Sequence, residues 1–303
     1  MDAYLDLARQ GKNAWWRYTL GVLLILGLWQ VVGAFPLAAV FVLERLAGNS
    51  QAGIEAGGVV GVGPLLGFTL ELLPSLFFLA GLFLAVRFIH GRPFRTLITP
   101  RPSLGWGRFW IGFGAWLIVV ALTSLVEARL YPGRYVWTFA ARQFIPLVIL
   151  AVLLVPIQTS TEELFFRAYF LQGLGLRTRS FWLLCAASGF LFMVPHFLNP
   201  EASSNYTLMG LYYFSMGAFL AYLTLRDGSL ELALGVHAAN NLYSVLVANY
   251  SVTALPSPSL FTVQVVDAAY GLISALVGMA LFVALVFRPW RAKPVESRPD
   301  GTA

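Results

Sequence analysis

The sequence is poor in charged residues. Asp, Glu, Lys and Arg together make up 11% of its 303 residues, whereas about 25% is usual for a soluble domain. Hydrophobic residues make up 58%, and the mean hydropathy is +0.75. This composition excludes an ordinary soluble domain, and we expect an integral membrane protein with several spans.

The chain also lacks cysteine pairs and a recognisable cleavable leader. Its one cysteine, Cys185, excludes an intrachain disulfide and a cysteine-based metal site, and its apolar surroundings predict a packing role. Residues 1–17 are polar and amphipathic, and no small-residue cleavage site follows a short apolar core. We therefore expect a cytosolic N-terminal segment rather than a signal peptide. The net charge of +6 follows the membrane topology, so nucleic-acid binding is not expected.

Long apolar runs predict the membrane spans. Runs of about 20 apolar residues mark transmembrane helices, and eight occur here, at residues 18–43, 65–89, 108–126, 143–173, 181–198, 206–225, 230–250 and 266–288. With Arg167 left aside, fifteen Lys and Arg residues lie on one side of this arrangement and four on the other. The richer side is cytosolic by the positive-inside rule. The predicted fold is all-α, a polytopic membrane helical bundle of about eight transmembrane helices with both termini in the cytosol.

Three parts of the chain are distinguished on this basis. Residues 1–141 hold the amphipathic N-terminus and three transmembrane helices, residues 142–250 form a four-helix core, and residues 251–303 hold the last helix and a polar tail. The composition of the tail predicts disorder in the cytosol. His90 lies in a loop on the cytosolic side and is expected at the membrane interface.

Polar side chains are concentrated in the fourth span. Glu162 and Glu163 are adjacent, and Arg167 follows Glu163 at i,i+4, which permits an ion pair on one helix face. An Asp or Glu at the centre of a membrane helix costs roughly 2.5–3.5 kcal/mol on insertion scales, so such residues are functional candidates. Glu162 is rotated by about 100° from Glu163. We expect Arg167 to hold Glu163 ionised, which leaves Glu162 free to act on a water molecule.

Two histidines and an asparagine extend this pattern to other spans. Counted from the turn between spans four and five, Glu162 and His196 lie at similar depth, so their side chains can face each other. His237 and Asn241 share a face at i,i+4 on span seven, and Asn240 shares it less well. His237 is only about ten residues from its own turn, some 15 Å along the helix, and this depth mismatch is the weakest point of the predicted geometry.

These groups suit peptide hydrolysis. A carboxylate and an imidazole that share a water form a general base, and a second imidazole with a carboxamide can stabilise an oxyanion. Alternatively, Glu162, His196 and His237 could be three zinc ligands, although the H-E-x-x-H pattern is absent. A purely structural interpretation also exists, in which the ion pair, histidines and asparagine only join helices.

Three short patterns resemble the CAAX prenyl protease and bacteriocin-processing family of intramembrane proteases, also called the CPBP or Abi family. That family carries E-E-x-x-x-R, F-x-x-x-H and H-x-x-x-N in this order. The sequence has Glu162-Glu163-Leu164-Phe165-Phe166-Arg167, then Phe192-Met193-Val194-Pro195-His196, then His237-Ala238-Ala239-Asn240-Asn241. The resemblance covers roughly residues 142–250.

The resemblance implies an eight-helix membrane protease whose substrate is a peptide or protein at the bilayer. It assigns water activation to Glu162 and His196, oxyanion stabilisation to His237 and Asn241, and a supporting role to Glu163 and Arg167. We favour a mechanism without a cofactor over one with zinc, because Glu163 is expected to be committed to Arg167 and unavailable to orient a metal-bound histidine.

The sequence also bears on the cellular location of the protein and on two alternative functions. Short loops and the lack of an organelle signal favour a bacterial inner-membrane protein, and the natural substrate stays open. A proton-coupled transporter is one alternative, although the Glu-Glu-Arg pattern is not repeated as an internal duplication would require. A non-enzymatic immunity or scaffold protein is the other.

Overall fold

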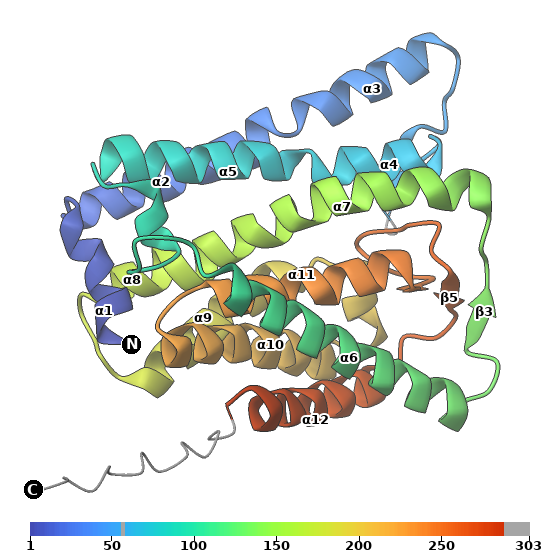
Figure 1. Cartoon of the computed structure of the whole chain (residues 1–303). Helices are drawn as coiled ribbons and strands as arrows, with labels where there is room; N and C mark the ends of the chain where they lie inside the picture. Colours follow the sequence, from blue (N-terminus) through green and yellow to red (C-terminus); the bar gives the residue numbers. More distant parts are fainter. Residues whose placement is uncertain (56–57, 288–303) are drawn as a thin grey trace, which may run out of the picture.

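The computed structural model describes residues 1–55 and 58–287, which fold into a bundle of long helices with short strands at one end (Figure 1). The first half of the chain contains α1 (Asp2–Leu5), α2 (Trp15–Leu26), α3 (Phe35–Leu46), α4 (Pro64–Leu72), α5 (Pro74–Leu84) and α6 (Trp106–Leu130). The second half contains α7 (Ala141–Glu163), α8 (Leu171–Leu174), α9 (Phe181–His196), α10 (Tyr206–Asp227), α11 (Glu231–Leu246) and α12 (Ala268–Val286).

Shorter helical segments of different pitch connect or extend these helices. Three are 3-10 helices, η1 (Asp6–Gln10), η4 (Phe94–Leu97) and η6 (Pro200–Ser204). Three are π-helical, η2 (Gly27–Val32), η3 (Ala85–Ile89) and η5 (Leu164–Phe170). Of the residues that the structure describes, 72% are helical, which confirms the predicted helical class.

Helices occur at all eight stretches predicted as spans. Within the described residues, six continuous helical segments are long and apolar enough to cross a membrane, namely Trp15–Leu46, Pro64–Ile89, Trp106–Leu130, Ala141–Leu174, Tyr206–Asp227 and Ala268–Val286. The apolar helix α9 is shorter, and α11 has only 16 residues. The protein is therefore a polytopic helical membrane protein, while eight spans and cytosolic termini stay predictions.

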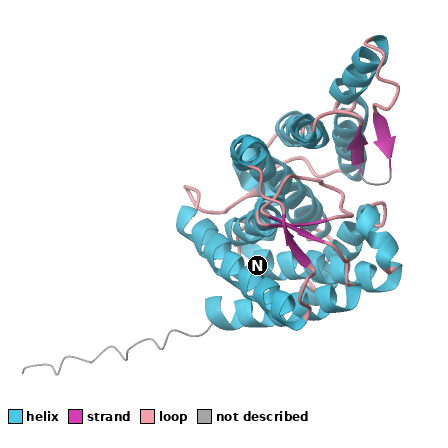
Figure 2. Ribbon diagram, turned by 90° about the vertical axis from the view of Figure 1, so that its right-hand side faces the viewer, coloured by secondary structure: helices cyan, strands magenta, loops and turns pink. Residues whose placement is uncertain are grey.

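Five three-residue strands lie at the end of the bundle opposite the N-terminus, and Figure 2 looks onto this end. The strands are β1 (Gly53–Glu55), β2 (Gly58–Val60), β3 (Tyr135–Trp137), β4 (Ala248–Tyr250) and β5 (Phe261–Val263). β1 pairs antiparallel with β2. In the second sheet β5 lies between β3, antiparallel to it, and β4, parallel to it. We call this the strand end, and the helical prediction did not include it.

The N-terminal segment closes the other end of the bundle. Tyr4 and Leu5 are fully buried, and the Tyr4 hydroxyl donates to the Leu97 carbonyl at 2.8 Å and lies 3.2 Å from that of Arg167. His90 directly follows the apolar segment Pro64–Ile89, and its place at the membrane interface stays a prediction. His90 is 1% exposed, with Nδ1 2.8 Å from the Lys12 carbonyl oxygen and Nε2 2.9 Å from the Tyr169 hydroxyl, because the N-terminal segment covers the loop that carries it.

Close helix contacts hold the centre of the bundle together. A Cβ on Gly235 of α11 would lie 2.1 Å from the Phe109 carbonyl oxygen of α6, and a Cβ on Gly112 of α6 would lie 2.4 Å from that of Leu232. Small residues of this kind let membrane helices approach backbone to backbone. The α6–α11 contact therefore fixes the position of α11, on which His237 and Asn241 lie.

Candidate active site

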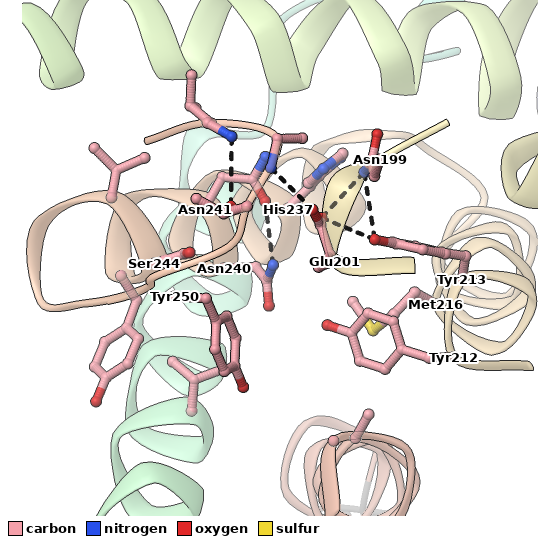
Figure 3. A pocket seen from close by; sticks show the side chains of 18 of the residues that line it. Asn199, Glu201, Tyr212, Tyr213, Met216, His237, Asn240, Asn241, Ser244 and Tyr250 are labelled. Atoms are coloured by element: carbon pink, nitrogen blue, oxygen red, sulfur yellow. Dashed lines mark hydrogen bonds between the residues drawn. The ribbon is translucent and has the colours of Figure 1, made fainter. Parts of the chain in front are cut away.

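One cavity of about 560 Å³ lies between α6, α7, α9, α10, α11 and α12, reaches residues of η2, α4 and α5, and extends to the strand end. Figure 3 shows part of its wall. Glu162, His196, His237 and Asn241 all line it. The structure thus brings to one cavity the four residues that the sequence predicted to converge, from three separate helices.

Glu163 and Arg167 form a fully buried ion pair behind the cavity. Arg167 Nη1 donates to Glu163 Oε1 at 2.9 Å, and both side chains are 0% exposed, as the i,i+4 spacing predicted. The Arg167 guanidinium also lies over the Phe192 ring at 4.2 Å, a favourable cation–π arrangement between two buried side chains. Directly after Glu163 the helix widens into the π-helical segment η5.

Glu163 contacts His237 as well, and this was not predicted. His237 Nδ1 lies 2.7 Å from Glu163 Oε1. An ionised carboxylate only accepts hydrogen bonds, so the proton lies on Nδ1 and the neutral ring keeps its lone pair on Nε2. Nε2 lies 3.7 Å from Glu162 Oε2. The two adjacent glutamates therefore contact the two nitrogens of one imidazole.

The depth mismatch expected for His237 does not exist. The helix α11 begins beneath the loop that follows η4, where the Leu230 amide donates to the Ile98 carbonyl at 2.8 Å and Glu231 Oε1 accepts from the Gly105 amide at 2.9 Å. Leu230 and Glu231 are buried there. Because α11 begins inside the bundle, two helical turns are enough to bring His237 level with Glu163.

A chain of side-chain hydrogen bonds ends on Glu162. Trp116 Nε1 donates to Asn240 Oδ1 at 3.2 Å, and Asn240 Nδ2 donates to Asn241 Oδ1 at 3.1 Å. Asn241 Nδ2 donates to Gln158 Oε1 at 3.1 Å, and Gln158 Nε2 donates to Glu162 Oε1. Every donor points toward the carboxylate, so the chain orients Glu162.

The sequence reasoning missed Gln158, although its spacing from Glu162 gave a signal. The two residues stand at i,i+4 on α7, where a glutamine amide can reach the carboxylate. Trp116 lies on α6, outside the region that carried the family patterns, and nothing in the sequence pointed to it.

His196 lies at the last residue of α9, between two aromatic rings. Its Nδ1 is 2.6 Å from the Phe192 carbonyl oxygen of its own helix, so Nδ1 donates and Nε2 carries the lone pair of the neutral ring. The imidazole centroid lies 4.1 Å from that of Phe192 and 4.7 Å from that of Tyr213. These contacts restrict the rotation of a potential base.

Glu201 supports this wall from the loop after α9, and it too was missed. Its Oε1 accepts from the Tyr213 hydroxyl at 2.9 Å and from Asn199 Nδ2 at 3.2 Å, as Figure 3 shows. Its Oε2 accepts from the Ala254 amide at 2.9 Å. Glu201 therefore joins two loops of the strand end to α10, and it positions the ring that packs on His196.

The residues do not form a metal-binding cluster. Within residues 1–55 and 58–287, no three His, Cys, Asp or Glu side chains are grouped closely enough to hold an ion. A zinc ligand lies about 2.0–2.2 Å from the metal, and the predicted set of Glu162, His196 and His237 is not gathered in that way. One argument against zinc was wrong, however, because Glu163 holds His237 Nδ1 in the manner of an outer-shell partner.

Comparisons with known proteins agree with the three sequence patterns. The family model of the type II CAAX prenyl endopeptidase Rce1-like proteins matches residues 141–243, which include every candidate site residue. The chain is also 34% identical over 295 residues to the Bacillus subtilis (strain 168) protein "Uncharacterized protein YyaK", with 97% of each chain covered. Membership of this family indicates a CAAX protease-type peptidase in a lipid bilayer. The chain belongs to the CPBP family of CAAX protease-like membrane proteins.

Proposed function

We propose that this protein is an intramembrane endopeptidase that hydrolyses a peptide bond of a membrane-associated peptide or protein. The observation that carries the proposal is the common cavity, where Glu162, His196, His237 and Asn241 meet. We place it in the bacterial inner membrane, in keeping with its Bacillus relative. The alternatives of a transporter or an immunity scaffold have no comparable geometric support, since neither needs a carboxylate oriented by four successive donors.

Water activation falls to Glu162 and His196. Glu162 Oε2 is not used by the hydrogen-bond chain that ends on Oε1, and the free lone pair of His196 lies on Nε2. A water held by both groups loses a proton to Glu162 as its oxygen attacks the carbonyl carbon of the substrate. The negative charge then develops on the carbonyl oxygen.

Stabilisation of that oxygen falls to Asn241 and His237. Asn241 Nδ2 uses one hydrogen on Gln158, and its second hydrogen is available for the oxyanion. His237 can donate from Nε2 once it has received the proton that Glu162 took from the water, and Glu162 Oε2 lies 3.7 Å from this nitrogen. The same proton then passes to the departing amine, which completes the cleavage and returns both side chains to their starting state.

The test is hydrolysis of a fluorogenic membrane-spanning peptide by purified protein in lipid vesicles. Glu162→Gln keeps the size of the side chain but removes the base, and we expect a loss of about 10²–10⁴-fold in kcat at normal protein yield. The matched control is Glu44→Gln, whose carboxylate accepts from Asn49 in a loop of the strand end. Equal activity of Glu162→Gln and the unmodified protein would overturn the proposed function.

A further inference from the structure

Of the loops at the two ends of the described bundle, those that line the cavity belong to the strand end. Loop residues in its lining come from the strand end, and they include Asn199, Glu201, Tyr250, Thr253 and Ala254. No residue of the loops at the other end, which lie at 90–105, 174–180 and 227–230, is part of the lining within the described chain. Ser244 lies one helical turn beyond Asn241 toward the strand end and also lines the cavity (Figure 3). A substrate that enters from the strand end therefore passes Ser244 before it reaches Asn241.

The opposite end is sealed by packed side chains. Tyr4, Leu5, Leu97 and Leu171 are completely buried there in a single hydrophobic cluster. Arg92 Nη1 donates to Gln172 Oε1 at 2.7 Å, and both residues are buried. The proposed catalytic groups are thus separated from this end by the N-terminal segment and its contacts.

The distribution of basic residues assigns the two ends to the two faces of the membrane. Among the described residues other than Arg167, eleven Lys and Arg residues lie toward the sealed end and four toward the strand end. N-terminal residues and the end of α12 lie together at the sealed end (Figure 1). Basic loops stay in the cytosol, so the open strand end lies on the extracytoplasmic face.

The wall of the cavity is acidic. Five carboxylate side chains line it, and no lysine or arginine of the described residues does. Arg134 pairs with Glu127 at 3.2 Å and with Asp267 at 2.8 Å. The remaining three, Glu71, Glu162 and Glu201, have no Lys or Arg at ion-pairing distance in the part of the chain that the structure describes. A cleft walled by one sign of charge attracts ligands of the opposite sign.

We propose that the cavity receives a positively charged segment of a membrane-associated peptide from the extracytoplasmic face. This inference rests on the proposed function and narrows its substrate class. A peptide chain with Lys or Arg near the scissile bond matches the acidic wall, whereas the described residues that line the cavity offer no Lys or Arg to a free terminal carboxylate. The substrate is therefore a basic peptide already exported across the membrane, cut at an internal bond.

Thiol labelling tests the access route without any need for catalysis. In a Cys185→Ala background, Ser244→Cys places a thiol inside the cavity and Ser180→Cys places one at the exposed turn before α9. The probe is a membrane-impermeant trimethylammonium methanethiosulfonate. We expect Ser244→Cys to react in intact cells, and Ser180→Cys to react only in inverted vesicles. Reaction of Ser244→Cys only in inverted vesicles, or in neither preparation, would overturn the inference.

The charge preference is measured with the same variants. At Ser244→Cys, the rate of reaction with the cationic reagent is divided by the rate with its anionic sulfonatoethyl analogue. This ratio is then divided by the same ratio for Ser50→Cys, which lies in the exposed loop after α3 and corrects for the different reactivities of the two reagents. We expect a cation preference of about tenfold or more at Ser244→Cys, which falls with added salt. Glu71→Gln should reduce the preference in the same background. A normalised ratio of one or less would contradict an acidic cavity.

Hydrolysis then separates this inference from the proposed function. Two peptides that differ only by Lys or Glu next to the cleaved bond are compared, and we expect about tenfold higher kcat/KM for the lysine peptide. Equal cleavage of both would overturn the substrate class while leaving the proposed function intact. If neither peptide is cleaved although both labelling results are as expected, the proposed function fails. The conclusion that the cavity admits cations from the extracytoplasmic face is then retained.

Discussion

At the scale of single residues, Glu163 has more contacts than its spacing predicted. The i,i+4 rule correctly predicted its pair with Arg167. The bond to His237 could not be predicted, because helix periodicity gives the face of a residue but not the rotation of one helix relative to another. The same limit applies to the bond between Gln158 and Asn241. Residue pairs within a helix were thus predictable, and pairs between helices were not.

The two contacts of Glu163 can be separated by substitution. Glu163→Gln leaves the buried Arg167 uncompensated, and breaking a buried pair in this way costs about 3–5 kcal/mol, so we expect low folded yield. A double variant, Glu163→Gln with Arg167→Met, removes the unpaired charge and should restore the yield, measured by size-exclusion chromatography in detergent. Its hydrolysis should stay impaired because His237 has lost its carboxylate. Recovery of activity together with yield would show that Glu163 serves only the ion pair.

The dependence of hydrolysis on a metal ion is determined by the spacing of Glu162, His196 and His237. The described chain has no group of three ligand-type side chains close enough for an ion, and His237 Nε2 and Glu162 Oε2 are 3.7 Å apart. We expect hydrolysis by the purified protein to persist after dialysis against a strong chelator, within about twofold of the untreated rate. Activity that is lost on chelation and restored by stoichiometric zinc would instead make Glu162, His196 and His237 metal ligands.

At the scale of helices and strands, the hydropathy pattern correctly located the helices but did not predict the short strands at the strand end. Apolar runs are long enough to be detected, whereas three-residue strands such as β4 and β5 depend on contacts between distant loops. The start of α11 was predicted within one residue, but its depth in the bundle was missed, because the loop before α6 covers it. These long-range features shape the cavity mouth, so the sequence predicted the residues of the site better than its surroundings.

The α6–α11 contact offers a matched test of packing. Gly235→Ala would place a Cβ 2.1 Å from the Phe109 carbonyl oxygen, whereas Gly114→Ala on α6 has nothing within 4 Å of its added carbon. We expect Gly235→Ala to destabilise the protein by about 1–3 kcal/mol and to lower kcat, since His237 is two residues away. Thermal unfolding in detergent measures the first effect. Equal melting temperatures for the two variants would show that the helices can separate freely.

At the scale of the whole molecule, the N-terminal segment connects the sealed end to the helix that carries the site. The Tyr4 hydroxyl donates to the Leu97 carbonyl in η4 and approaches that of Arg167 in η5. Tyr4→Phe leaves both buried carbonyls without this donor, which costs about 1–3 kcal/mol, while the ring still fills its space. The control is Tyr206→Phe, whose side chain is 56% exposed. We expect only Tyr4→Phe to lower the melting temperature in detergent. An unchanged melting temperature would mean that the N-terminal segment covers the bundle without stabilising it.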